Sequence, residues 1–173
     1  MGHLKAKDVI RDIPDFPKPG IIFKDITPVL QDPEAFSEAV QLLTQRVADW
    51  KPTCVAGIES RGFIFGAPIA LQLGLPFAVV RKLGKLPAET IREEYALEYG
   101  TNTVEMHSDA VQAGDRVVVV DDLLATGGTA LASARLIERL RAEVAGFAFL
   151  VELTFLPGRH ALRGYPVASL IEY

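Results

Sequence analysis

Short apolar runs alternate along this chain with segments whose apolar residues recur at helical spacing. The clearest run is residues 117–120, four successive valines, which predict a strand buried on both faces, as in a parallel sheet. Residues 53–58 also read as a strand, whereas Phe36, Val40 and Val47 follow the period of a helix. Because strands that alternate with helices specify a mainly parallel sheet covered on both faces, the pattern predicts an α/β fold.

Two segments do not follow either period. Residues 13–28 hold four prolines and a glycine among apolar residues, which predicts an ordered, irregular arm rather than a helix. Residues 83–102 are charged and weakly periodic, and loops of this length in compact domains are usually functional or mobile. Elsewhere we expect helices at 4–11, 33–47, 61–73 and 130–140, strands at 53–58, 77–80, 103–106, 117–120, 147–153 and 167–171, and a helical turn near 157–162.

Composition narrows the class of protein. A chain of 173 residues and 18.8 kDa is most simply one domain (residues 1–173), able to bury about two-thirds of its unfolded surface. The net charge of −4 and the pI near 5.4 argue against nucleic acid as the main partner. The single cysteine, Cys54, excludes an internal disulfide and fits a reducing cytoplasm, where we expect a buried, inert thiol. With no leader pattern and no 18-residue apolar stretch, we expect neither secretion nor a membrane partner.

The segment after the valine strand has the composition of an anion cradle. Gly127 and Gly128 can adopt backbone angles closed to other residues and let a ligand approach the main chain. The N–H groups of such a turn and of the following helix start attract an anion, and Thr126 and Thr129 each offer a hydroxyl. No lysine lies in the loop, so the site suits a phosphate monoester rather than a triphosphate.

Two adjacent carboxylates, Asp121 and Asp122, precede this cradle where the strand is expected to end. Carboxylates do not hold phosphate, but they accept hydrogen bonds from vicinal sugar hydroxyls or position a hydrated cation. A plainer interpretation is that Asp122 and Thr126 only cap a helix. The buried strand, the acid pair and the helix occur in register, however, which favours a site for a ribose 5-phosphate at the carboxyl end of the sheet.

Residues 117–129 resemble the phosphoribosyl pyrophosphate (PRPP) motif of the type I phosphoribosyltransferases. That motif also occurs in PRPP synthetases and in PRPP-sensing regulators, so other segments decide. Residues 15–28, 57–63, 81–87 and 97–100 are similar, in order and spacing, to signatures of the members of this family that use adenine. The resemblance runs from about residue 13 to the C-terminus. It implies a twisted, mainly parallel sheet flanked by helices, an N-terminal hood arm (about 1–30) and a flexible active-site lid (about 83–102).

The resemblance also implies a role for individual residues. Glu98 and Arg61 would be catalytic, with Glu98 near the imidazole nitrogens of the purine and Tyr99 in the lid. Many relatives carry Asp where this chain has Glu59, which leaves the individual role of Glu59 open. Adenine would contact Ile22, Phe23, Lys24 and Arg61; PRPP would contact Asp121, Asp122, Ala125, Thr126, Gly127, Gly128 and Thr129; pyrophosphate would contact Glu59, Ser60, Arg61, Arg81, Lys82 and Lys85.

The implied reaction converts adenine and PRPP to AMP and pyrophosphate, with inversion at the anomeric carbon. Mg²⁺ would be the cofactor, held mainly by PRPP and water rather than by a direct protein ligand set. A homodimer is also implied, in which the basic group Arg81, Lys82 and Lys85 reaches the PRPP of a neighbouring subunit. A transferase for 6-oxopurines, a PRPP-sensing regulator and a PRPP synthetase are the competing interpretations.

Overall fold

The computed structural model describes residues 4–96 and 100–173. These residues form two compact units, one up to Leu42 and one from Leu43 to Tyr173, and each unit is described by itself. Among the described residues, no helix combines the length and apolar character needed to cross a bilayer.

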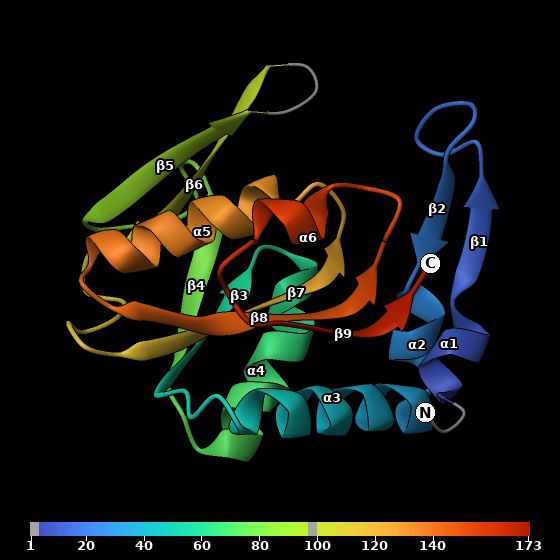
Figure 1. Ribbon diagram of the computed structural model, residues 1–173, viewed down its shortest axis with the longest axis horizontal. Coiled ribbons are helices and arrows are strands. Elements are labelled where there is room, and N and C mark those ends of the chain that lie inside the picture. The colour runs from blue at the N-terminus through green and yellow to red at the C-terminus, as the bar shows by residue number, and fades with distance from the viewer. Residues whose placement is uncertain (1–3, 97–99) are drawn as a thin grey trace. The chain divides into compact units, whose positions relative to one another are not determined.

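The first unit is built around a two-stranded antiparallel hairpin (Figure 1). Cross-strand ion pairs join Arg11 to Asp25 (2.6 Å) and Lys24 to Asp12 (2.7 Å). The segment expected to be irregular is therefore partly strand, because these charge pairs and the ring contact between Phe16 and Phe23 (centroids 5.2 Å apart) hold its two sides together. Its elements are α1 (Lys5–Val9), β1 (Arg11–Pro14), β2 (Ile22–Asp25), α2 (Thr27–Gln31) and the first part of α3 (Pro33–Ala48).

A seven-stranded sheet forms the second unit in the part of the chain that the structure describes, in the order β5-β6-β4-β3-β7-β8-β9. Strands β4, β3, β7, β8 and β9 run parallel, and β6 joins β4 and β5 in antiparallel register. This arrangement confirms the predicted α/β fold. The strands are β3 (Cys54–Ile58), β4 (Phe77–Lys82), β5 (Thr90–Ala96), β6 (Thr101–His107), β7 (Arg116–Leu124), β8 (Glu143–Glu152) and β9 (Val167–Glu172).

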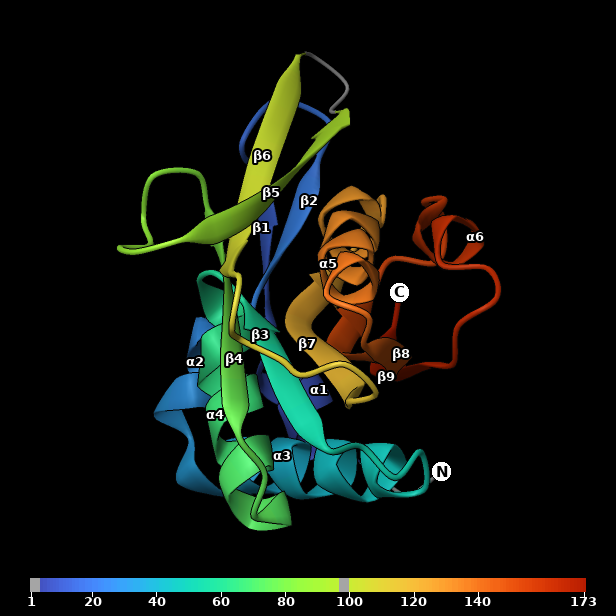
Figure 2. The same ribbon diagram turned by 90° about the vertical axis from the view of Figure 1, so that its left-hand side faces the viewer.

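Helices cover both faces of this sheet (Figures 1 and 2). Helix α4 (Arg61–Leu73) packs on β3 and β7 from one side, while α5 (Gly128–Arg139) packs on β8 and β5 from the other, beside the short α6 (Gly158–Ala161). The four valines 117–120 have no exposed surface, as predicted for a strand buried on both faces. Cys54 is likewise buried, and burial raises the pKa of its thiol to about 11, which makes it unreactive.

The structure corrects two expectations about where strands lie. Residues 90–96 of the expected loop 83–102 form β5, paired along its whole length with β6. The alternation of apolar and polar residues expected of a strand is not visible in this sequence, because Glu93 occupies an inward position. Arg135 and Arg139 of α5 neutralise its charge there. Strand β7 also continues past the acid pair to Leu124, because β8 pairs with it as far as Glu152.

Candidate active site

Two loops meet at the carboxyl edge of the sheet. The pairing of β3 with β7 ends at Gly57 and Val120, so the residues that follow each strand lie side by side. Gly62 approaches β7 so closely that an added Cβ would lie 2.5 Å from the carbonyl oxygen of Val120 and 3.0 Å from Asp121 Oδ1. Only glycine allows this contact. The pocket formed here has a volume of about 240 Å³ and is lined by Glu59, Ser60, Arg61, Lys82, Asp121 and Asp122.

A second, smaller pocket of about 90 Å³ adjoins the first through Asp121. It lies at the start of α5. The first residue of this helix is Gly128, and the preceding residue, Gly127, has the left-handed conformation (φ 81°). Backbone N–H groups and the dipole of a twelve-residue helix make this end suited to an anion. The structure thus brings together every residue expected to contact PRPP: the pocket is lined by Asp121, Leu123, Leu124, Ala125, Thr126, Gly127, Gly128, Thr129, Ala130 and Phe149, and Asp122 lines the first pocket.

The two acids have different surroundings. Asp122 is buried and accepts a hydrogen bond of 2.5 Å from Arg61 Nε, which is half exposed at the pocket. Asp121 has no such cation at contact distance among the described ion pairs and accepts the N–H of Asp122 on its Oδ1 (2.9 Å). Loss of water, followed by the neighbouring charge of Asp122, raises the pKa of Asp121 well above its ordinary value. One acid is therefore neutralised by a partner, whereas the other is destabilised in its ionised form.

Replacing the destabilised acid is expected to stabilise the protein. A carboxyl whose pKa is raised by folding loses stability as the pH rises through that pKa, so Asp121→Asn should raise the melting temperature at neutral pH by about 2–4 °C. The asparagine oxygen can still accept the N–H of Asp122. Thermal unfolding followed by circular dichroism measures this shift. The advantage of the variant should shrink as the pH is lowered, and a variant that is less stable at neutral pH would contradict the assigned electrostatics.

Glu59 lines the first pocket, but its carboxylate bonds to the neighbouring strand. Its carboxylate accepts two hydrogen bonds from Arg81, from Nη2 (2.8 Å) and Nε (3.2 Å), and a third from the N–H of Lys82 (3.1 Å). The bonds from Arg81 lower the pKa of Glu59. Arg81 also donates to the carbonyl oxygen of Lys85 (2.9 Å). Of the basic group predicted for pyrophosphate, Lys82 lines the pocket, while Arg81 and Lys85 are outside its lining.

A carboxylate that the sequence did not single out organises the turn after β4. Glu105 on β6 is 1% exposed and accepts the N–H groups of Lys85 and Leu86, each at 2.9 Å. Burial alone would raise the pKa of Glu105, but these donors and the charge of Arg92 (3.6 Å) lower it. Its signal in the sequence was a lone carboxylate between the two apolar residues Val104 and Met106.

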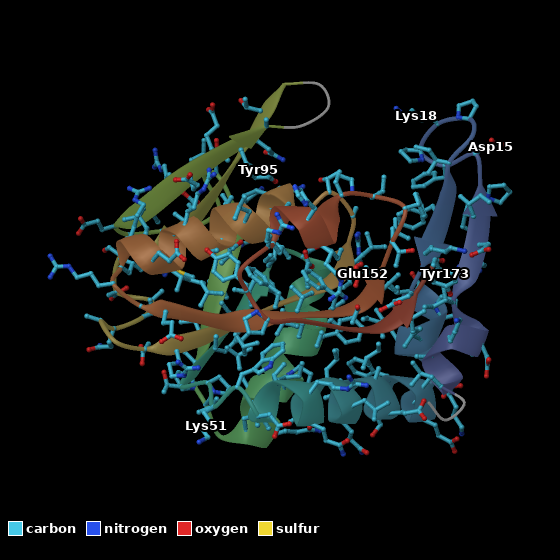
Figure 3. The ribbon with its side chains drawn as sticks, in the orientation of Figure 1. Asp15, Lys18, Lys51, Tyr95, Glu152 and Tyr173 are labelled. Atoms are coloured by element: carbon cyan, nitrogen blue, oxygen red, sulfur yellow. The ribbon has the colours of Figure 1, made fainter. Side chains whose placement is uncertain are left out.

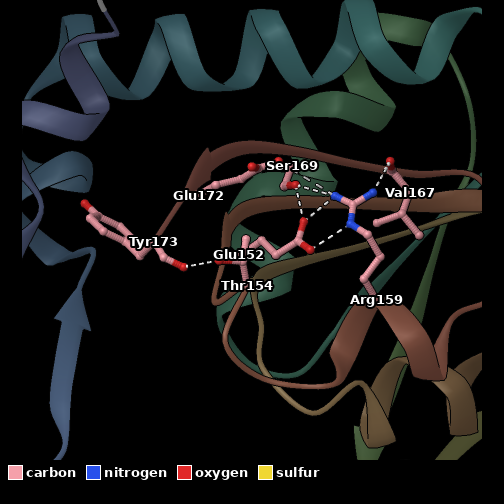
Figure 4. A network of polar contacts seen from close by, with 7 residues as sticks. All are labelled: Glu152, Thr154, Arg159, Val167, Ser169, Glu172 and Tyr173. Atoms are coloured by element: carbon pink, nitrogen blue, oxygen red, sulfur yellow. Dashed lines mark hydrogen bonds and ion pairs between the residues drawn. The ribbon is translucent and has the colours of Figure 1, made fainter.

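Helix α6 packs directly against the loop of residues 125–129. An added Cβ on Gly158 would lie 2.3 Å from the carbonyl oxygen of Ala125, and one on Gly127 would lie 2.9 Å from that of Gly158. Arg159, the next residue of α6, donates from Nε to the buried Glu152 (2.7 Å) at the end of β8 (Figure 4). Ser169 of β9 donates to the same carboxylate (2.5 Å). This network connects α6 to β8 and β9, and so holds the helix in place against the loop of residues 125–129.

Tyr95 of β5 reaches the same loop and was also missed. Its hydroxyl oxygen lies 2.9 Å from Thr129 Oγ1, where β5 runs over α5 (Figure 3). The ring edge would lie 3.1 Å from a Cβ on Gly128, so the two residues are in close contact. No motif in the sequence indicates this residue, because the weak periodicity of residues 83–102 predicts a loop there.

The other predicted site residues either belong to the first unit or lie outside the described residues. Glu98 and Tyr99 lie outside the described residues. Of the residues expected to bind the base, Ile22, Phe23 and Lys24 belong to the first unit, on β2, whereas Arg61 lines the first pocket of the second unit. Within that unit, the ring of Phe23 contacts Phe16 edge-on, Lys24 pairs with Asp12, and Ile22 is 58% exposed.

Comparison with known proteins relates this geometry to characterised enzymes. The family described as "Phosphoribosyl transferase domain" matches residues 26–161. The adenine phosphoribosyltransferase of Carboxydothermus hydrogenoformans is 59% identical over 170 residues, which cover 98% of this chain and all of the relative. The crystal structure of the enzyme of the same name from Thermoanaerobacter pseudethanolicus is 56% identical, covers 98% of both chains and superposes with a TM-score of 0.95. The Saccharomyces cerevisiae adenine phosphoribosyltransferase, solved with adenine and an imino-altritol bisphosphate, is 39% identical, with 95% and 96% coverage and a TM-score of 0.89.

Proposed function

Because this chain belongs to the adenine phosphoribosyltransferases of the phosphoribosyl transferase domain family, we propose how its residues transfer the phosphoribosyl group of PRPP to adenine, giving AMP and pyrophosphate. One observation carries the proposal: the acid pair on β7 lies where two pockets adjoin, with Asp121 lining both and Asp122 lining the first. One pocket ends in a helix start with glycines and hydroxyls, and the other contains Arg61 and Lys82. A donor with a phosphate at one end and pyrophosphate at the other fits this order.

The loop of residues 125–129 holds the 5-phosphate through backbone N–H groups and the hydroxyls of Thr126 and Thr129. Asp121 and Asp122 accept hydrogen bonds from the ribose hydroxyls. The donor is thereby held with its anomeric carbon beside the first pocket, and this positioning lowers the entropic part of the barrier.

The leaving pyrophosphate occupies the first pocket. We assign Ser60, Arg61 and Lys82 to it, and Glu59 acts indirectly by holding Arg81 and the end of β4. Arg61 donates to Asp122 (2.5 Å), and it exchanges this bond for one to the pyrophosphate when the sugar hydroxyls occupy Asp122. Cationic donors aimed at the leaving group stabilise the charge that develops as the C–O bond stretches toward an oxocarbenium-like state.

Magnesium is the proposed cofactor. Within residues 4–96 and 100–173, no three His, Cys, Asp or Glu side chains gather as a metal-binding group. The carboxylates of Asp121 and Asp122 are nevertheless oxygen donors of the kind Mg²⁺ accepts, alone or through water. The residues therefore fit a cation brought by PRPP, which would neutralise the pyrophosphate oxygens.

Base recognition, assembly and location complete the proposal. Phe23 stacks on adenine, and main-chain groups near Ile22 and Lys24 form hydrogen bonds with the Watson–Crick edge of the base. A 6-oxopurine presents a different donor pattern, so its binding leaves a buried polar group without a hydrogen bond. Glu98 acts at the imidazole nitrogens and Tyr99 belongs to the lid. We further propose a cytoplasmic homodimer, in which Arg81 and Lys85, which lie outside the lining of the first pocket, reach the pyrophosphate of the other subunit, while Lys82 contacts the pyrophosphate of its own subunit.

The test is to mix the purified chain with PRPP, Mg²⁺ and, in separate reactions, adenine, hypoxanthine, guanine or xanthine, and to identify the nucleotide by mass spectrometry. AMP from adenine, with no nucleotide from the others at equal concentration, is the expected result. Product from a 6-oxopurine would indicate the rival transferase, and PRPP binding without turnover would indicate a regulator. Light scattering on the same sample measures the mass of the assembly.

A further inference from the structure

We propose that Tyr95 is a positioning residue for the 5-phosphate of PRPP, acting through the hydroxyl of Thr129. The inference rests on the proposed function, because it takes residues 125–129 as the phosphate loop. It adds a residue from β5, a strand that contributes nothing to the lining of either pocket.

Two contacts place Tyr95 at the start of α5. Its hydroxyl oxygen is 2.9 Å from Thr129 Oγ1, and its ring lies against Gly128, where any Cβ would come within 3.1 Å of Cδ2. The main-chain oxygen of Thr129 is engaged separately, by the hydroxyl of Ser133 (2.8 Å). The side-chain hydroxyl of Thr129 is thus oriented by Tyr95, while its backbone belongs to the helix.

Strand β5 is itself fastened to α5, so the position of Tyr95 is well defined. Glu93, two residues earlier and on the same face of the strand, pairs with Arg135 (3.2 Å) and Arg139 (3.4 Å). Arg139 also donates to the carbonyl oxygen of Arg92 (2.6 Å). These contacts are spaced along the helix, and they hold the strand in one register over it.

The number of hydrogen bonds that each hydroxyl can form determines how Tyr95 and Thr129 act together. A threonine hydroxyl has one hydrogen and two lone pairs, so Thr129 donates to Tyr95 or to a phosphate oxygen, not to both. When a phosphate oxygen accepts the hydrogen bond from Thr129, the Tyr95 hydroxyl turns and donates its own hydrogen bond to Thr129 Oγ1. The resulting chain, from Tyr95 to Thr129 to phosphate, polarises the threonine hydroxyl and strengthens its bond to the anion.

Tyr95→Phe tests this step, because it removes the hydroxyl and keeps the ring against Gly128. We expect the KM for PRPP to rise about 3–10-fold, the range for one hydrogen bond between neutral groups, while the KM for adenine stays within about twofold. Calorimetry should show the same loss of affinity for ribose 5-phosphate, which lacks the pyrophosphate. Tyr165→Phe is the matched control: its hydroxyl bonds to Glu138 on α5 (2.7 Å), and neither residue lines the two pockets.

The outcomes separate the inference from the function on which it rests. A wild-type chain that neither binds ribose 5-phosphate nor makes AMP would reject the proposed function. An active wild type with an unchanged Tyr95→Phe variant, or a variant that loses PRPP and adenine affinity equally, would overturn the role of Tyr95. In a Thr129→Val background, which lacks the intermediate hydroxyl, Tyr95→Phe should cause no further loss of ribose 5-phosphate affinity. An additional, independent loss would also overturn the proposal.

Discussion

Asp122→Asn is expected to reduce kcat/KM for PRPP by about 100-fold or more. A carboxylate that accepts bonds from sugar hydroxyls contributes roughly 1.5–3 kcal/mol for each bond, and the neutral amide loses most of this. The substitution also removes the carboxylate that pairs with Arg61, a side chain that is half exposed and therefore solvated. Steady-state kinetics with PRPP as the varied substrate, together with calorimetric titration of PRPP, measures the effect.

Asp109→Asn is the control for this experiment, because it removes an exposed carboxylate that lines neither pocket. Its kinetics should equal those of the wild type. Asp122→Asn should also lack the gain in melting temperature expected for Asp121→Asn, since Asp122 is neutralised by Arg61 in the folded state. Unchanged PRPP affinity and turnover in the Asp122 variant would remove the acid pair from sugar binding.

Gly158→Ala is expected to weaken PRPP binding by at least about tenfold, although this residue touches no part of the proposed substrate. The added methyl group would lie 2.3 Å from the carbonyl oxygen of Ala125 and 2.8 Å from the side chain of Leu124. Backbone must shift to relieve such contacts, and overpacking of this kind typically costs about 1–3 kcal/mol. The part that shifts is the loop expected to grip the phosphate. Calorimetry with ribose 5-phosphate and thermal unfolding report the two consequences.

His160→Ala, on the same helix, provides the comparison. His160 is exposed, so its truncation should leave both ribose 5-phosphate affinity and melting temperature close to those of the wild type. If Gly158→Ala bound ribose 5-phosphate as tightly as the control, the loop would not depend on α6 for its shape.

The main framework of the second unit was predictable because local pattern and tertiary environment agree there. The valines of β7 are apolar on both faces since both faces are covered, and α4 ends at Leu73, before Gly74 in the left-handed conformation. Strand β5 was not predictable, because its inward Glu93 reads as a surface residue until the arginines of α5 are placed against it. A charge is compatible with a packed face only when its partner is known.

The site shows the same division between local and long-range information. The residue types of the acid pair and of the glycine loop are consecutive in the chain, so the chemistry proposed for the sugar and phosphate contacts could be inferred from the sequence. Tertiary structure alone decided that Asp122 is neutralised while Asp121 is not, and that Gly158 and Tyr95 support the loop. Partners more than thirty residues apart in the chain set these properties. Burial and electrostatic pairing depend on distances in space, which no local pattern of residues encodes.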